Sequence, residues 1–223
     1  MKSTQASESL SFLEFDPPQP AVTTLIWLHG LGATCEDFVP WVPELRDLSG
    51  LPLRFVFPQA PLRPVTINNG YVMPAWFDIS SLDKSGLIDP AGISTSVQQI
   101  NALIQHEKER GFTHNKIIVA GFSQGAVIAL STLMTDPEKL AGAIALSGFL
   151  PTNTQWPSPH RPPIFMGHGM RDEIVPYAYG KAAAEMLIQA DYPLSWHTYP
   201  MSHSVCEQEV RDLAVWLKEV IAE

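Results

Sequence analysis

The sequence predicts an α/β protein in which helices cover both faces of a mostly parallel central sheet. Short apolar, β-branched runs alternate with longer helix-like stretches along the chain, which is the order of a parallel sheet with helical crossovers. The apolar runs are nearly continuous, as in strands that are buried on both faces. The 223 residues, 45% of them hydrophobic, are enough for one sizeable core.

We expect a single domain over residues 21–223, after an N-terminal lead-in at residues 1–20. The lead-in is polar at first, contains an edge strand near residues 10–15 and ends in a stiff Pro-rich connector. No chemistry is expected from it.

The elements of the domain are predicted from apolar periodicity and from their flanking turn residues. The helix at 36–48 should be irregular or start late, because Pro40 and Pro43 interrupt it. Residues 63–92 are so rich in Pro, Asn and Gly that we expect a long loop. The remaining strands are predicted at 23–28, 53–57, 116–120, 140–147, 163–168 and 194–199, and the remaining helices at 93–110, 126–134, 178–190 and 205–222.

The charge of the chain argues against several kinds of partner. The net charge is −9 and no basic run is present, so nucleic acid and anionic membrane surfaces are not expected as partners. No stretch approaches the roughly 18 apolar residues of a membrane span, and residues 1–15 lack the apolar core of a signal peptide. We therefore expect a cytoplasmic protein without stable membrane insertion.

The two cysteines, Cys35 and Cys206, are too few for a disulfide framework and lack metal-site spacing. Free, buried and inert thiols are the simplest interpretation. Since each follows a predicted functional loop, the alternative is that alkylation of one of them modulates activity.

The pentad 121–125, Gly-Phe-Ser-Gln-Gly, stands between a predicted strand and a predicted helix. A serine in such a tight turn has a strained backbone, and flanking glycines are needed where the strand and helix cross. Ser123 would then expose its Oγ at a helix N-terminus, where free N–H groups favour a developing oxyanion. Ser123 is therefore the candidate nucleophile.

A second glycine-rich turn, His-Gly-Leu-Gly at residues 29–32, follows the strand at 23–28. Small residues at the carboxyl end of a strand let backbone N–H groups approach a ligand closely, as an oxyanion hole requires.

The acid and the base should also follow strands, because functional groups of a parallel sheet collect at the strands' carboxyl ends. Asp172 follows the strand at 163–168, and we prefer it to the adjacent Glu173 because its shorter side chain holds an imidazole more rigidly. A helix cap is the alternative role of Asp172. His203 follows the last strand and is the candidate base. The other histidines are read as structural (His29, His168, His197) or as surface residues (His106, His114, His160).

The predicted loop at 63–92 carries several large apolar side chains. Met73 and Trp76 are candidate walls of a substrate site, as is Ile174 beside the acid. The alternative is that the aromatic residues pin the loop to the core, or that the loop is a lid or a dimer contact.

The chain order Ser123, Asp172, His203 is that of the α/β-hydrolase fold. In detail the sequence resembles the phospholipase/carboxylesterase family of α/β hydrolases, which includes bacterial carboxylesterases and acyl-protein thioesterases. The resemblance covers roughly residues 21–221 and rests on these segments: Leu28-His29-Gly30-Leu31-Gly32, Phe57-Pro58-Gln59-Ala60-Pro61, Arg63-Pro64-Val65-Thr66, Trp76-Phe77-Asp78, Gly121-Phe122-Ser123-Gln124-Gly125, His168-Gly169 with Asp172, Val175-Pro176, and Met201 with His203-Ser204.

This resemblance implies a two-step acyl transfer through Ser123, His203 and Asp172, with the backbone N–H groups of Leu31 and Gln124 as oxyanion donors. No metal or organic cofactor is implied. The chain departs from the family pattern at Ala126, which should be harmless in a helix, and at residues 148–149, which leaves the acyl-chain length open.

The function expected from these observations is hydrolysis of short to medium acyl esters or thioesters of a small or lipid-like molecule. Depalmitoylation of proteins, lysophospholipid hydrolysis and peptidase activity are alternatives within the enzyme class. From another class, a non-catalytic binding protein on the same fold is the rival hypothesis. A homodimer is an option that the sequence leaves open.

Overall fold

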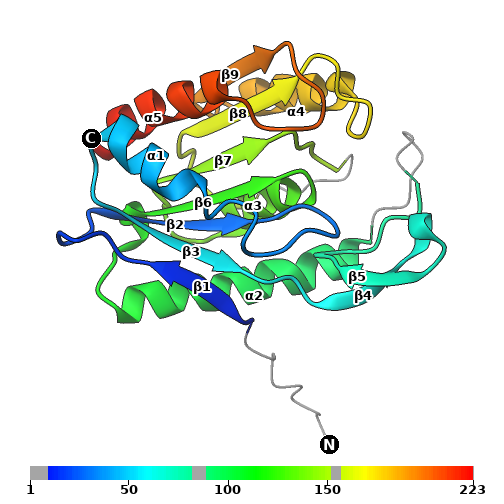
Figure 1. Ribbon diagram of the computed structural model, residues 1–223, viewed down its shortest axis with the longest axis horizontal. Helices are drawn as coiled ribbons and strands as arrows, with labels where there is room; N and C mark the ends of the chain where they lie inside the picture. Colours follow the sequence, from blue (N-terminus) through cyan, green and yellow to red (C-terminus); the bar gives the residue numbers. More distant parts are fainter. Residues whose placement is uncertain (1–9, 82–88, 152–156, 223) are drawn as a thin grey trace, which may run out of the picture.

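The computed structural model describes residues 10–81, 89–151 and 157–222. The first nine residues of the predicted lead-in, and residues 82–88 of the predicted loop, lie outside the described residues. Seven strands form one sheet in the order β1-β3-β2-β6-β7-β8-β9 (Figure 1). Their bounds are Phe12–Phe15, Leu53–Pro58, Thr23–Leu28, Ile117–Phe122, Gly142–Leu146, Ile164–Gly169 and Leu194–Tyr199.

The sheet is parallel except at one edge, where β1 pairs with β3 in an antiparallel register that sets Phe12 opposite Pro58. The predicted edge strand and the predicted mostly parallel sheet are both confirmed. Strands β2, β3, β6, β7 and β8 are almost wholly buried, which explains their continuous apolar sequences.

Helices cover both faces, as predicted (Figure 1). Residues of α2 (Pro90–Glu109), α3 (Gln124–Thr135) and α4 (Tyr177–Gln189) belong to one apolar cluster on one face. Residues of α1 (Trp41–Ser49) and α5 (Glu207–Ala222) belong to a second cluster on the other face. The sheet therefore lies between two separate hydrophobic layers.

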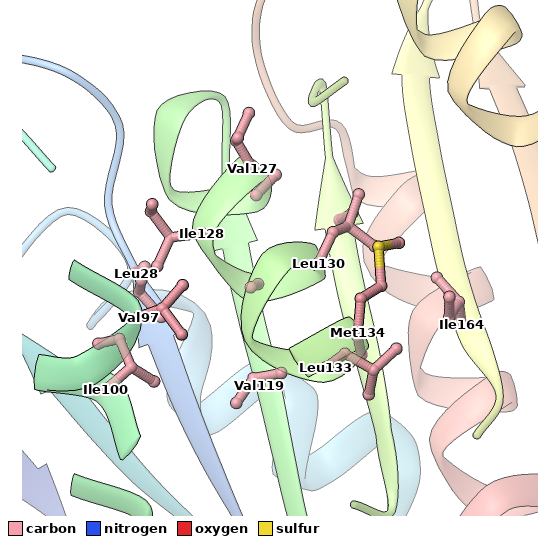
Figure 2. Packing of buried hydrophobic residues seen from close by; sticks show 14 of the residues in the cluster. Leu28, Val97, Ile100, Val119, Val127, Ile128, Leu130, Leu133, Met134 and Ile164 are labelled. Atoms are coloured by element: carbon pink, nitrogen blue, oxygen red, sulfur yellow. The ribbon is translucent and has the colours of Figure 1, made fainter. Parts of the chain in front are cut away.

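Helix α3 lies at the centre of the larger layer. Every residue from Gln124 to Met134 is buried, so this helix has no solvent face. Figure 2 shows Val127, Ile128, Leu130, Leu133 and Met134 of α3 among side chains from α2 and the strands. The helix that follows the serine is thus fixed by packing on all sides.

The starts of α1 and α2 have local causes. Helix α1 begins only at Trp41, after Pro40, as the late start of the predicted helix at 36–48 anticipated. Helix α2 begins three residues earlier than predicted, at Pro90. Asp89 caps it by accepting a hydrogen bond from the Gly92 N–H, and proline suits the first helical position.

The prediction of a loop over residues 63–92 is wrong for its first part. Residues Leu62–Val65 (β4) and Tyr71–Pro74 (β5) form a two-stranded antiparallel ribbon, joined through the 3₁₀ turn η1 at Thr66–Asn68. Asn69 and Gly70 both adopt positive φ, which reverses the chain within a few residues. Pro64 and Pro74 are tolerated because a two-stranded ribbon has two free edges. A second short 3₁₀ turn, η2, spans His114–Lys116.

Within the described ranges, no helix combines the length and the apolarity that crossing a membrane would need.

A buried guanidinium anchors the end of the molecule away from the glycine-rich turns. Arg54 of β3 is fully buried and forms ion pairs with buried Glu107 of α2 and with the partly exposed Glu14 and Asp16. Burial alone would lower the pKa of Arg54, but its hydrogen bonds to the three carboxylates outweigh burial and raise it. Arg54 therefore ties α2 and the lead-in to the sheet.

We expect Glu107→Ala to lower the free energy of unfolding by about 3 kcal/mol, because removing one partner leaves a buried charge undercompensated. Urea denaturation measures this change. Glu109→Ala on the exposed face of the same helix is the matched control and should stay within about 0.5 kcal/mol of the wild type. If both variants lowered the free energy of unfolding equally, the buried Arg54–Glu107 ion pair would have no particular role in stability.

Candidate active site

The turn between β6 and α3 holds Ser123 in a strained conformation, with φ 55° and ψ −117°. A Cβ at Gly121 would collide with the Gly125 backbone, and one at Gly125 would collide with the carbonyl of Leu28. The two glycines are thus required by the close crossing of strand and helix, as predicted. Ser123 itself is partly exposed.

The structure brings the three predicted catalytic residues together from three loops at the carboxyl ends of strands. His203 Nε2 lies 2.9 Å from Ser123 Oγ, and His203 Nδ1 lies 2.7 Å from Asp172 Oδ2. The carboxylate fixes the proton on Nδ1, so the Nε2 lone pair faces the serine hydroxyl. This arrangement is able to take the proton of the serine.

Asp172 is held more firmly than its neighbour Glu173. Its side chain is buried, and Oδ1 accepts hydrogen bonds from the N–H groups of Ile174 and Val175. Glu173 points toward solvent. The alternative role of Asp172 as a helix cap is not seen, since α4 begins after Pro176.

His168 lies next to Asp172, the candidate acid. It is fully buried, its Nε2 donates to the Val175 carbonyl at 2.9 Å, and the same nitrogen lies 3.5 Å from Asp172 Oδ2. Burial lowers the pKa of His168, although the Val175 carbonyl and the Asp172 carboxylate oppose this shift. The ring is thereby kept neutral, which agrees with the predicted structural role.

His29 locks the glycine-rich turn through both ring nitrogens. Its Nε2 accepts the Ala60 N–H at 3.1 Å, so the proton lies on Nδ1, which donates to the Gly30 carbonyl at 2.7 Å. Burial lowers the pKa of His29 and favours this neutral form. The Gly30 carbonyl and the Leu31 N–H belong to one planar peptide, so the imidazole also fixes the direction of that N–H.

The predicted oxyanion donors are the N–H groups of Leu31 and Gln124. Among the described residues, neither group donates a hydrogen bond to a protein acceptor. Gln124 is the first residue of α3, where a free N–H and the positive end of the helix dipole coincide.

Trp76 does not lie where the sequence led us to expect it. Its side chain is fully buried, so it offers no surface to a substrate. Its indole N–H donates to the His29 carbonyl at 2.9 Å. The alternative in which an aromatic residue pins the segment to the core fits this position.

The other two predicted substrate contacts are better exposed. Met73 of β5 is partly buried, and a Cβ on Gly32 would lie 3.4 Å from its sulfur, so it packs against the glycine-rich turn. The side chain of Ile174 is 55% exposed beside Asp172. Their role as substrate contacts stays a prediction.

Cys35 and Cys206 are free thiols of intermediate burial. We expected both thiols to be buried, and neither is fully buried. Burial raises the pKa of Cys35, which lowers its thiolate fraction and its reactivity.

Comparison with known proteins gives a consistent result. A family model described as Phospholipase/Carboxylesterase matches residues 15–221. Acyl-protein thioesterase 1 of Cryptococcus neoformans is 36% identical over 96% of this chain and 98% of its own length. Acyl-protein thioesterase 1 of Mycosarcoma maydis is 39% identical over 89% of this chain and 91% of its own length.

Solved structures agree. Acyl-protein thioesterase 2 of Zea mays superposes with a TM-score of 0.82 at 25% identity, over 95% of this chain and 99% of that one. The carboxylesterase of Bacillus cereus, 22% identical with a TM-score of 0.77 over 95% of this chain and 94% of its own, shares the fold.

A buried carboxyl that sequence analysis missed lies close to β8, the strand that precedes Asp172. Glu209 of α5 is fully buried against Gly167 of β8, and its oxygens have no hydrogen-bond partner among the described residues. Burial, reinforced by the charge of Asp212, raises the pKa of Glu209 to about 8. The Cys206 N–H opposes this shift without reaching hydrogen-bonding geometry. The signal in the sequence is a Glu one turn before Leu213, on the apolar face of an amphipathic helix.

Because the folded pKa of Glu209 is about 8 and its ordinary value is 4.5, the folded state keeps a proton that the unfolded chain releases between these pH values. The stability that this proton provides is complete below pH 4.5 and is lost as pH rises toward 8. Glu209→Gln cannot ionise. Its free energy of unfolding should therefore gain on the wild type as pH rises from 5 to 8, by at most about 1.4 kcal/mol per unit.

Urea denaturation at several pH values measures this gain. Glu207→Gln on the exposed side of α5 is the matched control and should show no such trend. A pH-independent difference between Glu209→Gln and the wild type would refute the assignment of a neutral carboxyl.

Proposed function

This chain belongs to the phospholipase/carboxylesterase family and is a serine hydrolase of carboxylic esters or thioesters, and on that premise we propose that Ser123, His203 and Asp172 carry out its chemistry. The observation that carries the proposal is the continuous hydrogen-bonded line from Asp172 Oδ2 through the His203 ring to Ser123 Oγ. The serine is the nucleophile, the histidine is the general base and then the general acid, and the aspartate orients the imidazole.

The reaction runs in two halves. Ser123 Oγ attacks the acyl carbonyl while His203 Nε2 takes its proton, and the same proton then goes to the leaving alcohol or thiol. Water, deprotonated by His203, attacks the acyl-enzyme, the bond between the acyl carbon and Ser123 Oγ breaks, and His203 returns the proton to Oγ as the carboxylic acid leaves. The Asp172 carboxylate stabilises the imidazolium in both halves, and the two N–H bonds that it accepts keep it in place.

Negative charge on the carbonyl oxygen is stabilised by the N–H groups of Leu31 and Gln124 in this proposal. They come from different elements, the first from the turn after β2 and the second from the start of α3. Loss of a comparable backbone-like donor reduces kcat by about 10² or more. No step requires a metal or an organic cofactor.

For the substrate we propose the acyl thioester of an S-acylated protein, since the relatives in fungi carry the name acyl-protein thioesterase. Short to medium acyl esters remain the simpler class that the same site accepts. The apolar side chains of Met73 and Ile174 would contact the acyl chain. A cytoplasmic location, as the sequence led us to expect, is part of the same proposal.

Hydrolysis of p-nitrophenyl esters from acetate to palmitate, together with palmitoyl thioester release from an S-acylated peptide, tests the proposal. Wild type should turn over both kinds of substrate, and Ser123→Ala should lose about 10⁴-fold or more of kcat, because the nucleophile is absent. Activity that rises with the length of the acyl chain favours the acyl thioester of a protein as the substrate. If Ser123→Ala is as active as the wild type, or if the wild type is inactive on every member, the serine mechanism is wrong for these substrates.

We also propose that the chain forms a homodimer. The two subunits would contact each other through the exposed apolar surface of the β4–β5 ribbon, which includes Leu62, Tyr71 and Val72. Sedimentation equilibrium should show a dimer for the wild type and a weaker one for Val72→Ser. Ile188→Ser, which removes an exposed apolar side chain of α4, is the control. A wild type that is monomeric at all concentrations disproves this assembly.

A further inference from the structure

Resting on the proposed function, we propose that Trp76 is a positioning residue that holds the two halves of the oxyanion hole in register. The Leu31 N–H and the Gln124 N–H stand on separate elements, the turn after β2 and the first turn of α3. The two N–H groups must be positioned to within a fraction of an ångström, and must point to the same place, for both to bind one oxygen atom. The segment 76–77 contacts both elements through hydrogen bonds.

The first tie runs to the half that carries Gln124. The side-chain amide of Gln124 is buried and grips the segment at two points: Oε1 accepts the Trp76 N–H at 2.7 Å, and Nε2 donates to the Phe77 carbonyl at 2.7 Å. The residue that supplies one donor is thus clamped through its own side chain.

The second tie runs to the half that carries Leu31. The Trp76 indole N–H donates to the His29 carbonyl, which fixes the peptide between His29 and Gly30. The His29 imidazole, whose centroid lies 5.4 Å from the nearest Trp76 ring, fixes the next peptide through the Gly30 carbonyl. Two successive peptides before the Leu31 N–H are therefore held, and the first of them depends on Trp76.

The segment itself is anchored to the scaffold. The Trp76 carbonyl accepts a hydrogen bond from the Ser96 hydroxyl of α2, and the whole tryptophan is excluded from solvent. The Gly32 N–H donates to the Pro74 carbonyl at 2.8 Å, which adds a second link between the glycine-rich turn and the segment at the end of β5. Both N–H groups of Trp76 are thus bonded to the two halves of the oxyanion hole and its carbonyl is bonded to α2, although the residue cannot touch the substrate.

The test compares Trp76→Phe with Trp27→Phe. Both remove a buried indole, but Trp27 packs against Phe38 in the other apolar layer and its indole N–H has no partner in the described part of the chain. We expect kcat/KM on a p-nitrophenyl ester to fall about tenfold in Trp76→Phe, as misplacement of a reacting group predicts, and to stay near the wild-type value in Trp27→Phe. Thermal unfolding shows whether each variant is folded.

Two inhibitors separate positioning from general damage. An alkyl trifluoromethyl ketone adds to Ser123 and places an oxyanion in the hole, so its affinity should fall by the same factor as kcat/KM. An alkyl ether of equal chain length has no carbonyl, and its affinity should be unchanged. If both inhibitors weaken equally, or if Trp76→Phe behaves like Trp27→Phe, the inference is overturned.

A second variant tests the other tie and stands in if Trp76→Phe does not fold. Gln124→Met keeps the backbone N–H but removes both side-chain hydrogen bonds, so it should show the same selective loss of the ketone. In the double variant the two losses of ketone affinity should not add, because both substitutions break the same hydrogen-bonded connection. Additive losses would contradict the inference. A wild type that neither hydrolyses esters nor binds the ketone refutes the proposed function, whereas failure of the variants alone refutes only the role of Trp76.

Discussion

The close crossing of β6 and α3 is the constraint on which the rest of the site depends. A side chain at Gly121 would collide with the Gly125 backbone, one at Gly125 would collide with the Leu28 carbonyl at the end of β2, and Ser123 between the two glycines adopts a positive φ. Such a conformation is unfavourable for a residue with a Cβ and persists only where its surroundings are rigid. The rigidity comes from α3, which is buried on every side, and from β6 at the middle of the sheet.

The parallel sheet brings the remaining groups to the same edge. Asp172 and His203 follow β8 and β9, two strands that neighbour each other, and the glycine-rich turn follows β2 next to β6. Each loop is then held by groups that take no part in chemistry: backbone N–H groups for Asp172, a neutral histidine for the glycine-rich turn and another beneath the acid. Burial lowers the pKa of both imidazoles, and the neutral His168, 3.5 Å from Asp172, does not compete as a cation with His203 for the carboxylate.

Arg54 and Glu209 are two buried ionisable groups of opposite character. Arg54 has three carboxylate partners and gains from them more than it loses by burial. Glu209 has no such partner and avoids the cost by staying protonated. The first group supports the scaffold near the amino end of β3, while the second lies against β8, the strand that leads to Asp172.

The sequence by itself determined the fold class, nearly all the elements and the three residues Ser123, Asp172 and His203, because these depend on local signals: continuous apolar runs, turn glycines and the rule that polar loops follow parallel strands. Only the tertiary structure decided that residues 62–74 form a ribbon, that Trp76 supports the site from inside the core instead of lining it, and that Glu209 is buried. For Trp76 and Glu209 the physical reason is that their positions depend on partners far away in the chain, whereas the ribbon is a local pairing whose prolines argue against strands in the sequence. The Trp76 indole and the His29 carbonyl are 47 residues apart, and no periodicity within either segment encodes their contact.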